Sequence, residues 1–267
     1  SLCRRFVYAR SLKVVWMLVE VLHPPGVEQP RMLIVRTRVH ARSIEEVHLA
    51  NADEVATFAT KKRHEEHLTG RWLLQCALEQ WGIDSVDLMV SRTEQRAPYL
   101  HYIPGLWKNT PLPSLSISHA SGWAYVALIE HGWRIGIDAE SSARGLQPNA
   151  FDLMAKGDEL QSLRQCPERA IEVWVGKEAV QKTLGMGMHL NPREIIIPIG
   201  VAKTIIPIEK SKIQLINWEY EGARIAVAFH QGSLDITTPE DRLLEATRSA
   251  MQDGDWGVGC KTTRGNA

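Results

Sequence analysis

Two acidic residues at the end of a strand-like segment are the first feature with a chemical interpretation. Residues 133–138 are mostly apolar, and Asp138 and Glu140 stand where that segment ends. Alternate side chains of an extended chain point the same way, so these two carboxylates share a face. Paired carboxylates suit a hard cation such as Mg²⁺, which takes oxygen ligands. The alternative is a strand that simply runs out into a solvated loop.

A second polar motif lies in a helical segment further along the chain. Trp174, Glu178 and Lys182 are spaced at i, i+4 and i+8, which places them on roughly one side of a helix. Lys177 lies about 100° around the helix axis from Glu178. Two lysines beside a carboxylate can hold a metal ligand and phosphate oxygens together. An ordinary amphipathic helix with a Glu–Lys pair is the alternative interpretation.

Two further groups of residues are candidates for binding phosphate. Ser118 and His119 stand at the end of a predicted strand, where a histidine can bind a phosphate or play a structural role. Basic residues gather at 61–63, with Arg71 two turns later and Arg92 and Arg96 in the next loop. Such clusters can clamp a phosphomonoester, with arginine bidentate and lysine as a point charge, but they are also common on solvated faces.

The elements that would position these residues follow from apolar periodicity and from turn residues. We expect helical regions at 43–81, ended by Gly82, and at 151–184, ended by Gly185. The turn at His131-Gly132 predicts a hairpin between 123–130 and 133–138. We expect a loop over 98–113 and a capped helix start at 238–241. Strands are predicted at 32–39, 85–91, 114–118, 123–130, 133–138, 195–199, 213–220 and 224–230.

The order of these elements contains a coarse repeat, because a long helix is followed by a strand in each half of the chain. We therefore expect an α+β fold with two similar lobes, each a long helix packed on a small, mostly antiparallel sheet. The active site would lie in the cleft between the lobes, where ligands commonly bind. The predicted divisions are a poorly defined segment 1–30, an N-terminal lobe 31–118, a C-terminal lobe 119–251 and a flexible tail 252–267.

Composition narrows the class of protein. The 267 residues include 31 Lys and Arg against 31 Asp and Glu, which argues against a nucleic-acid coat protein or a polybasic membrane binder. The four cysteines form no Cys-x-x-Cys pair, so we expect no zinc site and a reducing cytoplasm. The apolar run at 14–22 is too short to span a bilayer. We expect a cytoplasmic monomer with no nucleic-acid or membrane partner.

The combination and order of these motifs resemble the 4′-phosphopantetheinyl transferase superfamily, in its larger monomeric two-lobed form. The residues Gly136-Ile-Asp-Ala-Glu140 precede Trp174-Val-Gly-Lys-Glu-Ala-Val-Gln-Lys182 at the family's separation. The segment Lys62-Arg-His-Glu-Glu-His-Leu-Thr-Gly-Arg71 is similar to a helix of the enterobactin-synthase branch. The sequence departs from the family pattern in two places. Arg96-Ala97 replaces Gly-Lys before Pro98, and Val175 follows the motif's aromatic residue where the family often has a small hydroxyl residue.

The resemblance implies a holo-[acyl-carrier-protein] synthase activity, in which phosphopantetheine moves from coenzyme A to a serine of an acyl or peptidyl carrier protein. Adenosine 3′,5′-bisphosphate would be released. The implied Mg²⁺ ligands are Asp138, Glu140 and Glu178, and Lys177 and Lys182 would contact the pyrophosphate. The implied contacts of the 3′-phosphate and adenine end are Lys62, Arg92 and His119, with Ser118 in support and Arg96 as a further candidate.

Catalysis by such a site would rest on positioning and on electrostatic stabilisation. We assign catalytic roles to Glu178 and Lys182, and either Glu178 or a metal-held water would accept the proton of the acceptor serine. The carboxylates and lysines also suit two alternatives: a Mg²⁺-dependent phosphodiesterase or pyrophosphatase, and a non-catalytic module that binds coenzyme A or a carrier protein.

Overall fold

Two four-stranded antiparallel sheets carry most of the elements that position the polar motifs. The computed structural model describes residues 19–232. One sheet has the order β1-β2-β6-β5, formed by Glu20–Leu22, Met32–Arg38, Trp123–Ile129 and Ser114–Ala120. The other has the order β7-β10-β9-β8, formed by Trp133–Ser141, Ala223–Gln231, Ser211–Tyr220 and Lys203–Ile208. A separate hairpin joins β3 (Leu88–Arg92) to β4 (Pro98–Tyr102).

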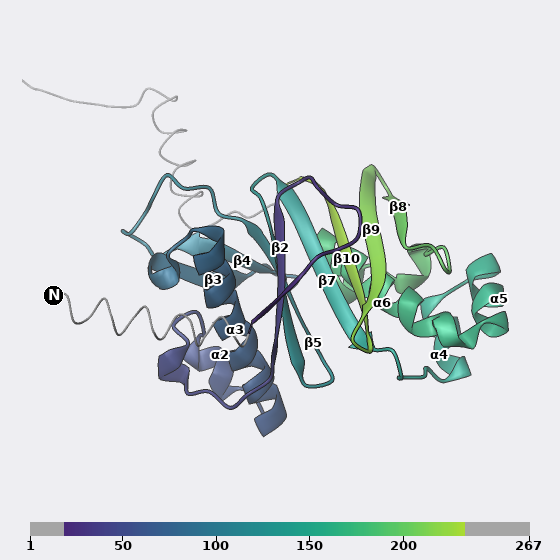
Figure 1. The fold of residues 1–267 in the computed structure, drawn as a ribbon, viewed down its shortest axis with the longest axis horizontal. Coiled ribbons are helices and arrows are strands. Elements are labelled where there is room, and N and C mark those ends of the chain that lie inside the picture. Colours follow the sequence, from purple (N-terminus) through teal and green to yellow (C-terminus); the bar gives the residue numbers. More distant parts are fainter. Residues whose placement is uncertain (1–18, 233–267) are drawn as a thin grey trace, which may run out of the picture. The chain divides into compact units, whose positions relative to one another are not determined.

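Each four-stranded sheet is covered on one face by a long helix. Helix α3 (Lys61–Trp81) packs on β2 and β6, and α6 (Ala170–Leu184) packs on β7 and β10 (Figure 1). Left-handed glycines end both helices: Gly82 with φ 92° and Gly185 with φ 67°. The shorter helices are α2 (Ala52–Ala56), α4 (Pro148–Met154) and α5 (Gly157–Gln165).

The face of each sheet that points away from its long helix contributes to one shared apolar core. Tyr125 and Ala127 of β6 pack in the same cluster as Ile135 and Ile137 of β7. The alternate residues of β6, including Val126, belong instead to the core under α3. Both faces of β6 are therefore buried, which explains why this strand reads as a continuous apolar run.

Three serines of β5 join the two sheets without any ladder hydrogen bond between β5 and β7. Ser114 Oγ donates to the Trp133 carbonyl at 2.6 Å, and Ser116 Oγ accepts from the Ile137 N–H at 3.0 Å. Ser118 Oγ donates to Asp138 Oδ1 at 2.8 Å. We call this contact the serine seam. It places the strand that carries Asp138 directly beside the strand that carries His119.

A buried arginine joins the sheets at another place. Arg36 on β2 is fully buried, with its guanidinium 4.0 Å from the ring centre of Trp123 and 4.4 Å from that of Tyr220. It donates to Glu20 at 2.8 Å and also to Glu221 in the turn between β9 and β10. The positive charge of Arg36 is therefore paired with two carboxylates, and its guanidinium group stacks on two aromatic rings.

The α+β class with antiparallel sheets is confirmed, while several predicted elements are corrected. The predicted hairpin at His131-Gly132 is wrong, because β6 already pairs with β2 and β5 and the chain crosses there to the other sheet. Part of the predicted loop 98–113 is strand β4. The predicted strand 195–199 is not formed, and the edge strand β8 lies later, at Lys203–Ile208.

The long predicted helices are also divided. The region 43–81 contains a 3₁₀ turn, α2 and α3, and the region 151–184 contains α5, a 3₁₀ turn and α6 after the end of α4. Strand β1 was not predicted. The predicted boundary at 118/119 falls inside β5, and the division into lobes stays a prediction. The predicted helix start at 238–241 and the tail 252–267 lie outside the described residues.

Candidate active site

Asp138 is the residue at which β7, β5 and α6 meet. Its side chain is largely buried, and Oδ1 accepts from Ser118 Oγ at 2.8 Å and from Lys182 Nζ at 2.7 Å. Lys182 Nζ also donates to the Ile137 carbonyl at 3.1 Å. The structure therefore brings Asp138 and Lys182 together in one polar group, although they are far apart in the chain.

Glu178 lies one helical turn before Lys182 and belongs to the same group. Burial raises the pKa of the Glu178 carboxyl, the charge of Asp138 raises it further, and the charge of Lys182 opposes both effects. The carboxylates of Asp138 and Glu178 therefore lie in a partly buried position beside the ammonium group of Lys182. We call Asp138, Glu178 and Lys182 the acidic site.

Gly136 explains how α6 approaches β7 closely enough to build this site. A Cβ atom at residue 136 would lie 2.1 Å from the Ala179 carbonyl oxygen and 2.5 Å from the Thr183 nitrogen. Only glycine allows this approach of helix backbone to strand backbone. The Thr183 hydroxyl is held in the same contact, because it lies 2.8 Å from both the Ala179 and the Ala228 carbonyl oxygens and shares its one proton between them.

Glu140, the third predicted metal ligand, faces a different partner. One of its oxygens accepts from the guanidinium of Arg144, and the other accepts from the Ser141 N–H at 3.1 Å. Within residues 19–232, no group of three or more His, Cys, Asp and Glu side chains is arranged to hold a metal ion. Asp138 and Glu178 fit a divalent cation by their oxygen donors and shared negative charge, whereas Glu140 would first have to leave Arg144.

Lys177 does not occupy the position that the resemblance implies. It is fully buried, and its ammonium group donates to Glu159 Oε2 at 2.7 Å, to the Pro192 carbonyl at 3.0 Å and to the Ile195 carbonyl. Glu159 in turn accepts from the Ile197 N–H at 2.7 Å. All three ammonium protons are therefore used to hold residues 192–197 and α5 against α6, and a pyrophosphate contact from Lys177 is not compatible with this geometry.

A second charged group forms where α2, α3 and β3 meet. Arg92 donates from Nε and Nη2 to Glu54 Oε1, at 2.9 and 2.5 Å. The other oxygen, Oε2, lies 3.8 Å from Arg71 Nη2 and 4.0 Å from His67 Nε2. We call Glu54, His67, Arg71 and Arg92 the arginine cluster.

Burial affects both α3 residues of this cluster. Burial and then the nearby Arg71 charge lower the pKa of His67 to about 4, so its imidazole is neutral. Burial and then Arg92 lower the pKa of Arg71 to about 10. Arg71 Nε and Nη1 and His67 Nε2 are buried without a hydrogen-bond partner among the described residues. Buried donors without acceptors are costly, and an anionic ligand would satisfy them.

His119 lies between the acidic site and the arginine cluster. Burial, and then the charges of Arg63 and Lys182, lower the pKa of His119 to about 4. A Cβ atom at residue 70 would lie 2.7 Å from His119 Nε2, so Gly70 makes room for the ring. Ser118 therefore contacts Asp138 of the acidic site, and His119 faces Gly70 on α3.

Two of the predicted phosphate contacts lie outside the arginine cluster. Lys62 has a side chain that is 84% exposed, and its ammonium lies 3.8 Å from Glu66. Arg96 is exposed in the turn between β3 and β4, with φ 69°, and its carbonyl accepts from Arg92 Nη1 at 3.2 Å. The structure therefore gives Arg96 a backbone role beside Arg92.

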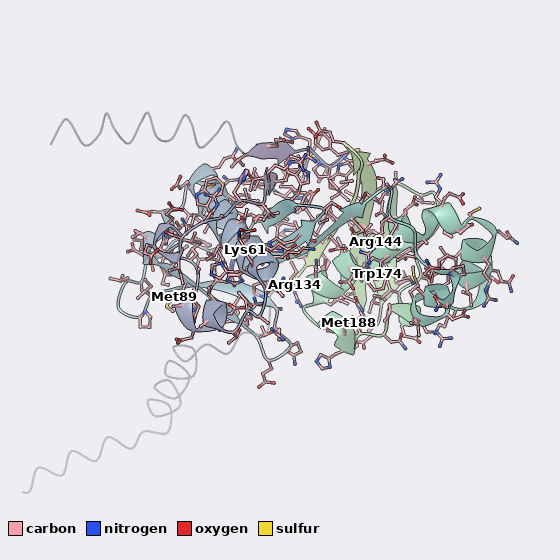
Figure 2. All side chains as sticks on the ribbon, turned by 90° about the horizontal axis from the view of Figure 1, so that it is seen from below. Lys61, Met89, Arg134, Arg144, Trp174 and Met188 are labelled. Atoms are coloured by element: carbon pink, nitrogen blue, oxygen red, sulfur yellow. The ribbon has the colours of Figure 1, made fainter. Side chains whose placement is uncertain are left out.

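Sequence reasoning did not select Glu54 or His67 for the site, and it considered Arg71 only as part of a basic group that could clamp a phosphomonoester. Arg63, His67 and Arg71 recur at i, i+4 and i+8, and this spacing could have identified one polar face of α3. Glu54 gives no comparable signal, because it lies in a separate five-residue helix. Figure 2 shows the described side chains, with Lys61 marking the start of α3 and Trp174 marking α6.

Comparison with known proteins agrees with this geometry. Residues 134–230 match the model of the 4′-phosphopantetheinyl transferase superfamily. The matched segment is one part of the chain. It includes all three residues of the acidic site and the glycine that lets α6 approach β7. A search of curated proteins finds no match. Among residues 19–232, no helix is long and apolar enough to cross a bilayer.

Proposed function

We propose that this protein transfers the 4′-phosphopantetheine group of coenzyme A to a serine of an acyl or peptidyl carrier protein. The observation that carries the proposal is the acidic site. Asp138, Glu178 and Lys182 come from the two motifs typical of the superfamily, and they converge within the segment that matches it. The proposal extends to the enterobactin-synthase branch, to a monomer with the substrate between two lobes, and to adenosine 3′,5′-bisphosphate as the second product.

In this proposal the arginine cluster binds one end of coenzyme A and the acidic site carries out the transfer. Arg71 and Arg92 hold the 3′-phosphate, because they provide guanidinium donors in the arginine cluster. Lys182 binds the pyrophosphate and stabilises charge as the phosphorus–oxygen bond breaks. The serine oxygen bonds to the phosphorus that carries pantetheine, and Glu178 accepts the serine proton.

A Mg²⁺ ion fits this proposal with Asp138 and Glu178 as its protein ligands. When bound, the ion would neutralise charge on the pyrophosphate oxygens. Lys182 would then exchange its present contact with Asp138 for the ligand, which its partly exposed side chain permits.

The test is incubation with coenzyme A, Mg²⁺ and a panel of apo carrier proteins, followed by the intact mass of the carrier. We expect a mass increase of one phosphopantetheine, and we expect Asp138→Ala to abolish it while the circular dichroism spectrum stays unchanged. Asp152→Ala is the matched control, because Asp152 is exposed and its ion-pair partner among the described residues is Arg164, which is also on the surface.

The other outcomes identify the alternatives. Hydrolysis of coenzyme A without a change in carrier mass would indicate a phosphodiesterase or pyrophosphatase. Binding without either reaction would indicate a non-catalytic module. Wild-type transfer by Asp138→Ala would remove the acidic site from the mechanism.

A further inference from the structure

Glu54 occupies the centre of the arginine cluster. Its Oε1 atom accepts two hydrogen bonds from Arg92, and its Oε2 atom faces Arg71 and His67. With the third Arg92 nitrogen bound to the Arg96 carbonyl, every nitrogen of that guanidinium has a partner. Two of the N–H groups of Arg92 are therefore taken by Glu54 and are not available to an incoming anion while Glu54 remains in place.

The carboxylate is a poor match for the donors around it. Glu54 Oε2 is 3.8 Å from Arg71 and 4.0 Å from His67, which is too far for a hydrogen bond. Arg71 is 2% exposed, yet two of its three guanidinium nitrogens have no partner in the described part of the chain. A tetrahedral group with three terminal oxygens would satisfy more of these donors than a planar carboxylate with two.

Charge leads to the same conclusion. Arg71 and Arg92 carry two positive charges, His67 is neutral because burial lowers its pKa to about 4, and Glu54 carries one negative charge. A phosphate monoester brings about −1.5 to −2 charges near pH 7. Such a group balances the two arginines alone, but it would be repelled if Glu54 kept its present position.

We propose that Glu54 holds the place of the ligand's phosphate in the free protein and is displaced when a phosphate monoester binds. Glu54 thereby sets the affinity of the arginine cluster for a phosphate monoester and the preference of the cluster for a doubly charged group. This inference rests on the proposed function only in naming the 3′-phosphate of coenzyme A as that monoester.

The local structure allows this displacement. Glu54 belongs to the five-residue helix α2, and its side chain is 24% exposed, so the carboxylate can turn toward solvent. Its ion-pair partners within residues 19–232 are Arg92, Arg71 and His67, all members of the cluster.

The test compares the full-length protein with Glu54→Gln, which removes the charge and keeps the shape. Isothermal titration calorimetry would measure binding of coenzyme A, of dephospho-coenzyme A, which lacks only the 3′-phosphate, and of inorganic phosphate. We expect Glu54→Gln to bind coenzyme A and phosphate about tenfold more tightly, because the competing charge is gone. Binding of dephospho-coenzyme A should change less than about twofold.

Two further variants make the comparison specific. Asp53→Asn removes one charge from the same helix at an exposed position and should bind all three compounds like the wild type. Glu54→Asp keeps the charge on a shorter side chain and should give an intermediate affinity. This variant also carries the test if Glu54→Gln does not fold.

The outcomes separate the inference from the proposed function. Unchanged or weaker binding of coenzyme A and phosphate by Glu54→Gln, with transfer intact, would overturn the displacement and leave the function standing. Tighter phosphate binding by Glu54→Gln, in a protein that neither transfers phosphopantetheine nor distinguishes coenzyme A from its dephospho form, would support the displacement and overturn the function.

Discussion

Lys177 and Lys182 belong to one motif on α6, yet their side chains have different surroundings. They are five residues apart, which is about 140° around a helix axis. Lys182 meets Asp138, and Lys177 turns to Glu159 and to the carbonyls of residues 192 and 195. The spacing predicts the angle between the two lysines. It does not predict which side of the helix is covered by a segment that follows in the chain.

Lys177→Met is expected to reduce the stability of the fold, because it leaves the buried Glu159 carboxylate without its cation. Removing one partner of a buried ion pair costs about 3–5 kcal/mol. Lys156→Met is the control, since Lys156 and Glu194 form a solvent-exposed pair that contributes little to stability. Urea denaturation would measure the free energy of unfolding, and equal effects of the two variants would contradict the structural role of Lys177.

At the scale of elements, the site depends on how closely α6 lies against β7. The glycine of the Gly-Ile-Asp motif could be recognised from the sequence. Only the packed structure shows why this position requires glycine. A Cβ atom at residue 136 has no room between β7 and the backbone of α6. Because Asp138 lies two residues further along the same face, any shift of α6 at Gly136 also changes the distance between Asp138 and the α6 side chains.

Gly136→Ala is expected to lower the free energy of unfolding by about 1–3 kcal/mol, the usual cost of overpacking, and to reduce activity as well. Gly145→Ala is the control, because no heavy atom lies within 4 Å of the Cβ position there. Thermal denaturation and the carrier-mass assay would measure the two effects. A Gly136→Ala protein as stable and active as Gly145→Ala would refute the close approach.

At the scale of the whole described chain, the packing of the two sheets against each other depends partly on side-chain hydrogen bonds. The serine seam replaces a strand ladder, so the Ile137 N–H on the outer edge of β7 depends on Ser116 for its partner. The acidic site and His119 lie on opposite sides of this seam, on β7 with α6 and on β5. Their separation therefore depends on hydroxyl groups that a sequence pattern does not distinguish from solvent-facing serines.

Ser116→Ala is expected to destabilise the protein by about 1–3 kcal/mol, because it leaves a buried N–H without an acceptor. Hydrogen exchange read by mass spectrometry should show the largest loss of protection in β7. Ser142→Ala, in the exposed turn after β7, serves as the control and should leave both the stability and the exchange pattern unchanged. The same exchange pattern in Ser116→Ala and Ser142→Ala would exclude a contribution of the seam.

The parts of the fold that could be predicted are those with a local cause. Gly82 and Gly185 end helices because glycine accepts a positive φ, and the apolar pattern identifies most strands. The hairpin at His131-Gly132 was predicted wrongly because a turn signal does not reveal that β6 is already paired on both edges. Glu54 could not be predicted for a similar reason, since only tertiary packing brings α2 to Arg92.

Arg36 gives the clearest example of a residue whose importance would be misjudged by experiments on activity alone. Its flat guanidinium stacks on Trp123 and Tyr220 while it binds Glu20 and Glu221. A lysine offers no plane to stack and no fork to share between two acids. A mutational scan scored by product formation would therefore group position 36 with the arginines that we propose to bind phosphate, although Arg36 would affect activity through the contact between the two sheets.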